Sequence, residues 1–91
     1  PEAFGRDILM RDVLDSAVAR ADSGQVPPAV EGAIRDVLGG SFLALGEYDK
    51  AATQYRRGVA AWARAGTALD SARAVSLKQL ATVHWSAGEN A

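Results

Sequence analysis

The sequence predicts an all-α fold of four antiparallel helices, and three observations support this prediction. Apolar residues recur at spacings of three and four along four segments of the chain. Nineteen of the 91 residues are alanine, the residue with the highest helix propensity. Gly24, Gly46 and Gly66 stand between the four segments and separate them, and Pro27 marks the start of the second. A chain of this length is expected to form one small domain, residues 1–91.

The first helix is expected over residues 6–21, where aliphatic and small residues recur on one face. This apolar stripe consists of Ile8, Leu9, Val13, Leu14, Ala17 and Val18. Arg11, Asp12 and Asp15 lie mostly outside the stripe and are interpreted as a solvated face, on which Arg11 and Asp15 can pair weakly. Gly24 follows the helix and is a candidate for the left-handed cap position.

The second helix is expected over residues 27–45, because Pro27 and Pro28 suit the first turn of a helix, where proline forfeits no helical hydrogen bond. Glycine inside a helix costs roughly 1 kcal/mol relative to alanine. Gly39 is therefore interpreted as a point where the second helix closely approaches Ala51 of the third. Gly40 points away from that contact.

The third helix is expected over residues 47–65, with Gly46 at the turn before it and Gly66 as its stop signal. The fourth is expected over residues 69–87, with Gly88 ending it. Apolar and small residues of the fourth helix are expected to form its packing surface: Leu69, Ala72, Ser76, Leu77, Leu80, Ala81, Val83 and His84.

The spacing of residues across the second and third helices resembles a known repeat. It reads Leu38-Gly39-x2-Phe42, then Tyr48, then Ala51-x3-Tyr55, and is similar to the 34-residue tetratricopeptide repeat, W-x2-L-G-x2-Y followed by A-x3-F. One complete repeat would cover residues 32–65. The match departs at Arg35, where the family often has Trp, and at Ala63, where it often has Pro. The resemblance implies a short right-handed stack of helical hairpins that acts as a protein-binding scaffold.

Weaker copies of the pattern flank the complete repeat. Leu77-x2-Leu80-Ala81-x2-His84 echoes Arg35-x2-Leu38-Gly39-x2-Phe42 at an offset of 42 residues. The first helix echoes the third at an offset of 34, which aligns Leu14 with Tyr48 and Ala17 with Ala51. The chain is therefore interpreted as the second helix of one repeat, a whole repeat, and the first helix of another. Because it begins at Pro1 without an initiator Met, it is expected to be a piece of a longer protein.

A narrower resemblance covers about residues 7 to 65. Its motifs are Arg11-Asp12-Val13-Leu14-Asp15-x-Ala17, Pro28-x2-Glu31, Leu38-Gly39, and Leu45-Gly46-x-Tyr48-x2-Ala51. They are similar to the C-terminal repeat region of bacterial serine/threonine kinases and to segments of large bacterial transcriptional regulators. This resemblance implies a regulatory or sensory arm. The chain itself has no kinase motif, so any kinase activity would lie outside it.

Candidate partner-binding residues follow from the repeat resemblance, because the first helix of each tetratricopeptide pair lines the concave groove that grips partners. Residue-by-residue matching gives Ala33, Asp36, Gly40 and Leu43 on the second helix, with Val75, Lys78, Thr82 and Trp85 on the fourth. Trp85 is the first candidate because tryptophan is enriched in binding hot spots; burial against a further helix is its alternative role. Repeats that grip chaperone C-terminal carboxylates use Lys and Asn, so Asp36 and Gly40 disfavour that partner class.

The sequence offers no chemistry for catalysis, and the chain is expected not to be an enzyme. Asp12 and Asp15 have no cleft to perturb them, and Ser41 has no credible triad. His84 is the only histidine and there is no cysteine, so a zinc site would lack its usual ligands. His84 is instead expected to pack in the core or at its edge, where the repeat often has an aromatic residue. No metal or cofactor is expected.

Charge and composition further narrow the partners. The net charge is −1, and Lys50, Arg56 and Arg57 form only a modest basic face, interpreted as a solvated outer face, so no nucleic-acid partner is expected. No apolar run approaches the roughly 20 residues of a membrane span, and no direct membrane contact is expected. A cytoplasmic location is favoured for this segment, with membrane anchoring of the longer protein left open.

Three functions remain open from the sequence. The first is a non-catalytic scaffold that binds a protein or peptide through the groove. The second is self-association, as a homodimer formed through the fourth helix with Leu77, Val83 and Trp85 as the open apolar groups. The third is the regulatory arm of a larger bacterial kinase or transcriptional regulator.

Overall fold

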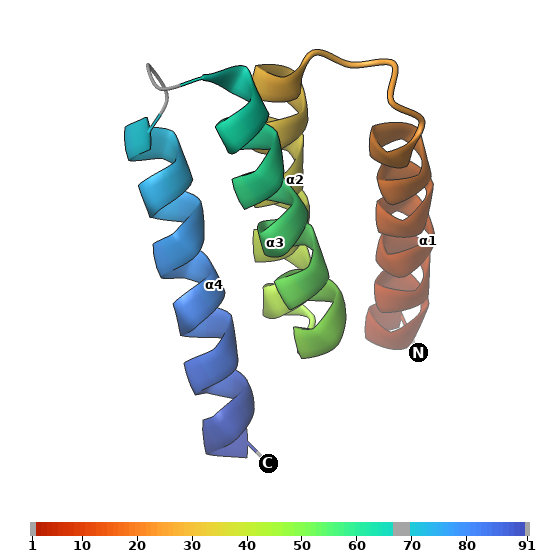
Figure 1. Ribbon diagram of the computed structural model, residues 1–91. Helices are drawn as coiled ribbons and strands as arrows, with labels where there is room; N and C mark the ends of the chain where they lie inside the picture. The colour runs from red at the N-terminus through yellow and green to blue at the C-terminus, as the bar shows by residue number, and fades with distance from the viewer. Residues whose placement is uncertain (1, 67–69, 91) are drawn as a thin grey trace.

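The computed structural model describes residues 2–66 and 70–90, and of residues 2–4, 7 and 90 only the backbone. Within these residues the protein is all-helical, with four helices and no strand, as predicted. The helices are α1 (Glu2–Asp22), α2 (Pro28–Ala44), α3 (Tyr48–Ala65) and α4 (Asp70–Asn90). Successive helices run in opposite directions, with α1 and α4 at the two ends of the row (Figure 1).

The turns are made where glycine was expected to make them. Gly24 and Gly46 have φ angles of 76° and 75°, in the left-handed region that favours glycine. At the end of α2 the Gly46 N–H donates to the carbonyl of Leu43 (3.0 Å) and the Glu47 N–H to the carbonyl of Phe42 (2.9 Å). These two bonds form a Schellman motif, which satisfies carbonyls that the end of a helix would otherwise leave unpaired.

Two helix ends differ from expectation. The first helix begins at Glu2 rather than at residue 6, and α4 continues through Gly88 to Asn90. Gly88 therefore does not end α4; glycine disfavours a helix but does not forbid one when its neighbours are good helix formers. The expected start of the fourth helix at residue 69, with Leu69 in its stripe, lies outside the described residues.

The closest helix contact in the fold is between α2 and α3, where two aromatic rings cover two glycines. A Cβ atom at Gly39 would lie 2.7 Å from the ring of Tyr55, and one at Gly32 would lie 2.5 Å from the indole of Trp62. Gly39 is therefore a point of close approach to α3, but its nearest neighbour is the ring of Tyr55 rather than Ala51 as expected. Trp62, half-buried, covers Gly32 in the same way about two helical turns away.

A small apolar core runs through all four helices. Its buried members are Leu14, Leu38, Phe42, Ala51, Ala52, Tyr55 and Val83. At only 1% exposed, Val83 contradicts the expectation that it is one of the open apolar groups of the fourth helix. Ser76, Leu80 and Val83 form the inner stripe of α4, at spacings of four and three. His84 lies outside this stripe and is exposed, so the expectation that it packs in the core is also wrong.

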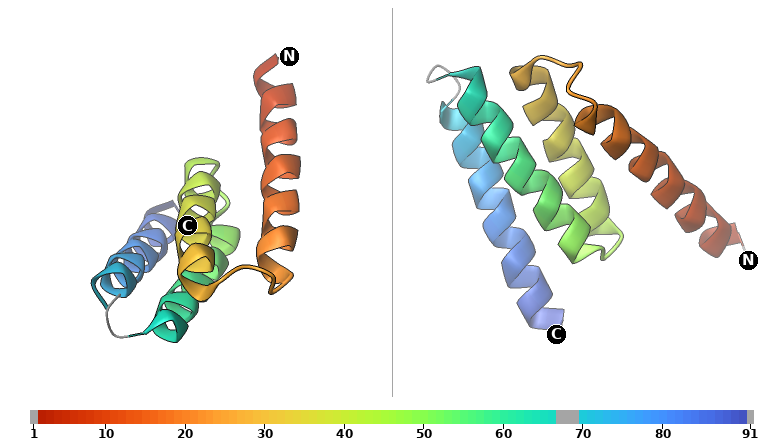
Figure 2. Two further views of the ribbon diagram at one scale, coloured as in Figure 1. Left: turned by 90° about the horizontal axis from the view of Figure 1, so that it is seen from above. Right: turned by 45° about the vertical axis from the view of Figure 1, so that its right-hand side comes forward.

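Helix α1 lies at one end of the row and diverges from α2 toward its N-terminus (Figure 2). It packs on the core near its C-terminal half, through Leu14 and Ala21. Four aliphatic side chains nearer its N-terminus are exposed: Ile8, Leu9, Met10 and Val13. Part of the apolar stripe expected for the first helix therefore faces solvent, because the helix leaves the bundle before those residues reach it.

We expect Gly39→Ala to destabilise the protein and Gly40→Ala to leave it unchanged or slightly more stable. A Cβ at Gly39 would press on the Tyr55 ring, and overpacking typically costs about 1–3 kcal/mol. A Cβ at Gly40 would meet only the Tyr55 hydroxyl, at 3.4 Å, and alanine would raise helix propensity. Urea unfolding of both variants measures the difference; equal midpoints would contradict this packing.

Candidate functional site

The predicted partner-binding residues divide into a half-buried set on α2 and an exposed set on α4. On α2, Asp36, Gly40 and Leu43 are half-buried, and Leu43 packs against the core. The set on α4 consists of Lys78 and Thr82, which are exposed, and of Trp85, which is 67% exposed. The outer face of α4 is therefore the accessible part of the predicted groove.

Asp36 is held inside the fold by hydrogen bonds from two other helices. The indole N–H of Trp62 on α3 donates to its Oδ2 (3.2 Å), and the hydroxyl of Ser76 on α4 donates to its Oδ1 (2.7 Å). Ser76 is fully buried, so this bond lies between α2 and α4. Through these two hydrogen bonds, Asp36 links α2 to α3 and to α4, and we call this contact a polar junction.

The preceding residue, Arg35, makes a second junction from the other side of α2. Its side chain is 3% exposed. Its Nη2 donates to Oδ1 of Asp22 at the end of α1 (2.7 Å), its Nη1 to Oε1 of Gln54 on α3 (2.9 Å), and its Nε to Oε2 of Glu31 on α2 (3.1 Å). Arg35 takes the place where the resembled repeat often has tryptophan, and it connects α1, α2 and α3.

Gly58 on α3 lies at the point where these two junctions meet. A Cβ there would be 3.1 Å from Oδ1 of Asp36 and 3.2 Å from Cβ of Arg35. A Cβ at this position would be tight against both charged residues, which would have to give way slightly. Glycine at position 58 therefore makes room for a polar junction as well as for close helix packing.

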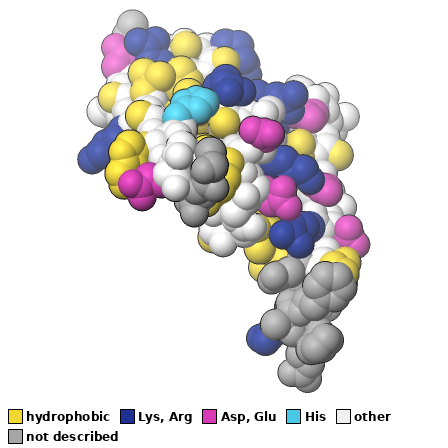
Figure 3. All heavy atoms as spheres, turned by 90° about the horizontal axis from the view of Figure 1, so that it is seen from below, with side chains coloured by type: hydrophobic (Ala, Val, Ile, Leu, Met, Phe, Trp, Pro, Cys, Tyr) yellow, Lys and Arg dark blue, Asp and Glu magenta, His cyan; other side chains and the backbone are white. Residues whose placement is uncertain are grey.

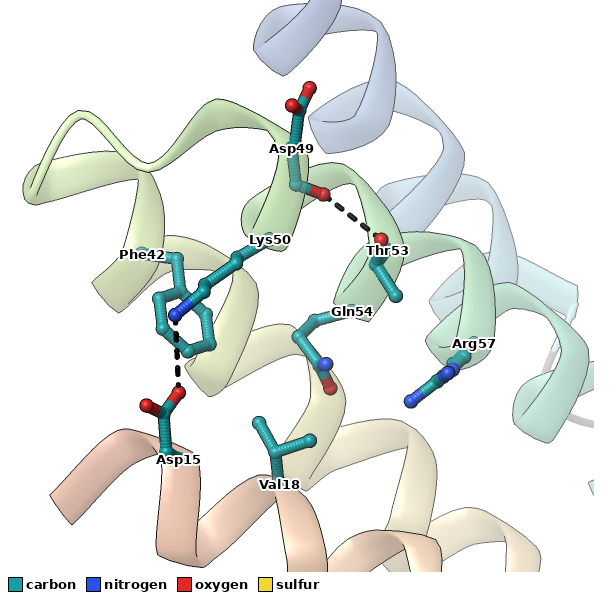
Figure 4. Close-up of a pocket in the computed structure, with 8 residues that line it drawn as sticks. All are labelled: Asp15, Val18, Phe42, Asp49, Lys50, Thr53, Gln54 and Arg57. Atoms are coloured by element: carbon teal, nitrogen blue, oxygen red, sulfur yellow. Dashed lines mark hydrogen bonds and ion pairs between the residues drawn. The ribbon is translucent and has the colours of Figure 1, made fainter. Parts of the chain in front are cut away.

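A hollow of about 280 Å³ lies between α1 and α3, and Phe42 of α2 also lines it (Figure 4). Its lining combines apolar and polar side chains: Asp15, Val18, Phe42, Asp49, Lys50, Thr53, Gln54 and Arg57. The ammonium of Lys50 lies 3.4 Å from Oδ1 of Asp15 and 5.6 Å from the centre of the Phe42 ring. Arg57 donates from Nη1 to Oδ1 of Asp22 (3.0 Å). These charges largely cancel across the hollow.

The ion pairs of this region correct two interpretations of the sequence. Arg11 does not pair with Asp15 along α1; its Nε donates to Oε1 of Glu47, which precedes α3 (2.9 Å), while Asp15 pairs with Lys50. The basic residues of α3 are likewise not a simple solvated face, since Lys50 and Arg57 contact carboxylates of α1. The periodicity of a single helix cannot reveal such pairs, because each joins segments 35 or 36 residues apart.

A second groove, between α1 and α2, is apolar. Its volume is about 410 Å³, and its lining residues are aliphatic or alanine: Leu14, Ala17, Ala33, Ile34, Val37 and Leu38. We call it the α1/α2 groove. Ala33, expected to line the partner-binding groove, lies here and is exposed, as is Val37. The lining supplies shape and apolar surface, the properties that accept a helix or an apolar ligand.

Among the described residues, no three His, Cys, Asp or Glu side chains are grouped so that they could hold a metal ion. The exposed imidazole of His84, cyan in Figure 3, lies at the surface. The pKa of the Tyr55 phenol is raised above its usual 10.0 by burial and, secondarily, by the negative charge of Asp36. No helix in the described part of the chain has the length and apolar character needed to cross a membrane.

Replacing Arg35 by Met is expected to destabilise the protein by about 2–3 kcal/mol. Methionine keeps much of the volume, but the buried Gln54 side chain loses its donor, and an unsatisfied buried group typically costs about 1–3 kcal/mol. Glu31 and Asp22 keep Arg64 and Arg57 as partners, which limits the loss. The matched control is Arg56→Met on the exposed face of α3. Equal urea midpoints for the two variants would rule out a junction at Arg35.

The raised pKa of Tyr55 predicts a stability change at alkaline pH. A group whose pKa is higher in the folded than in the unfolded protein contributes stability that is present below the unfolded pKa and is lost as the pH rises through the folded pKa. For Tyr55 this loss begins near pH 10. Unfolding free energies measured across that range should fall more steeply for the native chain than for Tyr55→Phe; parallel curves would contradict the prediction.

Comparison with known proteins adds no family assignment to this geometry. No protein-family model, curated protein sequence or solved structure matches the chain. The tetratricopeptide resemblance remains a prediction from residues 32–65.

Proposed function

We propose that this chain is a non-catalytic protein-binding module, built as a short right-handed stack of tetratricopeptide-like hairpins. Its contact surface is the outer face of α4, formed by Val75, Lys78, Thr82 and Trp85. The resemblance over residues 7–65 favours a place for this module within a larger regulatory protein.

The packing of the α2–α3 hairpin supports the repeat part of the proposal. Leu38, Gly39 and Phe42 of the repeat pattern are buried on α2, and Ala51 and Tyr55 are buried on α3. Burial of these pattern residues between the two helices is what such a hairpin would require, and it supports the proposal. Arg35 replaces an aromatic residue at the edge of that contact.

The exposure of Trp85 is the observation that carries the binding proposal. Two thirds of this large side chain faces solvent, although burying apolar surface is favourable by roughly 25 cal/mol per Å². Trp85 projects from a helix whose inner side is fixed in the core by Ser76 and Val83. An aromatic side chain on a rigid support loses little conformational entropy when it binds, which is a property of binding hot spots.

The surroundings of Trp85 indicate the chemistry of the partner. Val75 adds apolar surface at one end of the face, and Lys78 supplies an exposed cation between them. The hydroxyl of Thr82 donates to the carbonyl of Lys78 (3.1 Å), so it presents an oxygen that can still accept. A peptide segment with an apolar anchor and a nearby carboxylate complements this face.

Selection from a random peptide display library on the intact chain tests this function. Enriched peptides are expected to contain an apolar anchor with a carboxylate nearby. Fluorescence polarisation should show at least about tenfold weaker binding to Trp85→Ala, as for a hot-spot residue, and a smaller loss for Lys78→Ala. The matched control is Leu9→Ala, which truncates an equally exposed side chain on α1.

The binding measurements are made with the chain at low concentration, so that contacts between copies do not compete. Peptides that bind Trp85→Ala and the native chain equally would place the contact elsewhere and refute the assignment to α4. Peptides weakened as much by Leu9→Ala as by Trp85→Ala would show nonspecific apolar adhesion, which also refutes it.

A further inference from the structure

One face of α4 is exposed to solvent, although the equivalent face of α2 is buried. The 42-residue offset aligns Arg35, Gly39 and Phe42 of α2, all buried, with residues of α4 that are exposed: Leu77, Ala81 and His84. Ala74, one turn earlier and also exposed, continues the same stripe at spacings of three and four. We call Ala74, Leu77, Ala81 and His84 the open α4 face.

A second apolar surface is uncovered at the opposite end of the row. It is the α1/α2 groove, in which Val37 is 69% exposed. A neighbouring hollow shares Ala17 with the groove and is lined by Val13, itself mostly exposed. The open α4 face lies on one outermost helix of the row, and the α1/α2 groove lies between the other outermost helix and its neighbour (Figure 1).

We propose that these two surfaces bind each other between copies of this chain, with α4 of one copy seated in the α1/α2 groove of the next. The contact is head to tail, because the two surfaces differ and lie at opposite ends of the molecule. A single contact of this kind covers both uncovered surfaces, whereas a two-fold pairing through α4 would leave the α1/α2 groove empty.

The hairpin within the chain supplies the template for this contact. Helix α3 packs on the face of α2 that is equivalent to the open α4 face, and α1 echoes α3 at the 34-residue offset. Leu14 and Ala21 of α1 are already buried in their own chain, but Ala17, which aligns with Ala51, lines the groove, so α4 of another copy can meet α1 there. Ala74 and Ala81 are small residues on the open α4 face, and small residues allow two helices to approach closely, as Gly39 does within the chain.

Length and charge agree with this arrangement. Helices α1 and α4 both contain 21 residues, about 31 Å at 1.5 Å per residue, so they can align along their whole length. The net charge of −1 per chain gives little repulsion between copies. The described lining of the groove is apolar, and the open α4 face presents alanine, leucine and the imidazole of His84 to it.

This contact is separate from the proposed peptide-binding function. The peptide face of α4 consists of Val75, Lys78, Thr82 and Trp85, whereas the contact between copies uses the neighbouring stripe. Loss of self-association in a variant that still binds selected peptides would therefore refute this inference only. Loss of peptide binding in a variant that still self-associates would refute the proposed function only.

The head-to-tail contact can be tested with two variants, each of which has one of the two surfaces disrupted, studied alone and as a mixture. Ala81→Glu introduces a charge into the open α4 face, and Val37→Glu introduces one into the groove; both positions are exposed, so the fold should persist. In sedimentation equilibrium the native chain is expected to grow beyond a dimer with concentration. Each variant alone is expected to associate at least about tenfold more weakly, because a buried unpaired charge is costly.

An equimolar mixture of the two variants is expected to form a one-to-one pair and stop there. The mixture retains one intact contact, between α4 of the Val37→Glu chain and the groove of the Ala81→Glu chain. Chains carrying both substitutions should remain monomeric. Ala60→Glu, an identical change on the exposed side of α3, is the matched control and should associate like the native chain.

Three outcomes would overturn the inference. The first is a native chain that stays monomeric at high micromolar concentration. The second is a Val37→Glu chain that dimerises as well as the native chain, because that result assigns the contact to a two-fold pairing through α4. The third is a mixture that fails to pair. Should Val37→Glu unfold in circular dichroism, Ala33→Glu replaces it, since Ala33 is a second exposed residue of the groove.

Discussion

The buried guanidinium of Arg35 is the interaction on which the arrangement of the first three helices depends. A charge withdrawn from water is tolerated only when its donors are satisfied, and Asp22, Glu31 and Gln54 satisfy them from three helices. None of these partners can move far without leaving the charge exposed to an apolar core. Apolar packing alone would permit α1 and α3 to slide along α2, whereas a planar group with fixed donor directions favours one register.

The carboxylate of Asp36, the residue after Arg35, connects α2 in a similar way to the helices at the other end of the row. Residues 35 and 36 project about 100° apart from a helix, so one side chain reaches α1 and the other reaches α4. Asp36 takes its hydrogen bonds from Trp62 and Ser76, and the two junctions share the space left by Gly58. The thin apolar core of the described residues is thus supplemented by directional contacts that set the relative position of all four helices.

Much of the fold could be predicted from the sequence because its signals are local. Helical periodicity identified the four helices, and Gly24 and Gly46 marked two turns because few other residues adopt their backbone angles. The face of α4 could not be predicted in this way. Apolar and small residues surround that helix, so periodicity did not distinguish buried Val83 from exposed Leu77; the choice is made by Ser76, whose partner Asp36 lies 40 residues away. The same limit applied to the candidate site. Periodicity did not show that Asp36 accepts hydrogen bonds within the fold, whereas Lys78 and Trp85 are exposed to solvent.

The way in which α1 is attached makes the local stability differ from one part of the protein to another. Several polar links hold this helix, including Arg11 to Glu47, Asp15 to Lys50 and Asp22 to Arg57, all between partly exposed side chains. Such pairs contribute little individually and are screened by salt. The C-terminal end of α1 is held more firmly, by the bond from buried Arg35 to Asp22 and by buried Leu14 and Ala21, so the N-terminal part of the helix is the portion that can open as a separate unit. Ionic strength then acts as a selective control, which loosens that part of one terminal helix while the hairpin beside it keeps its structure.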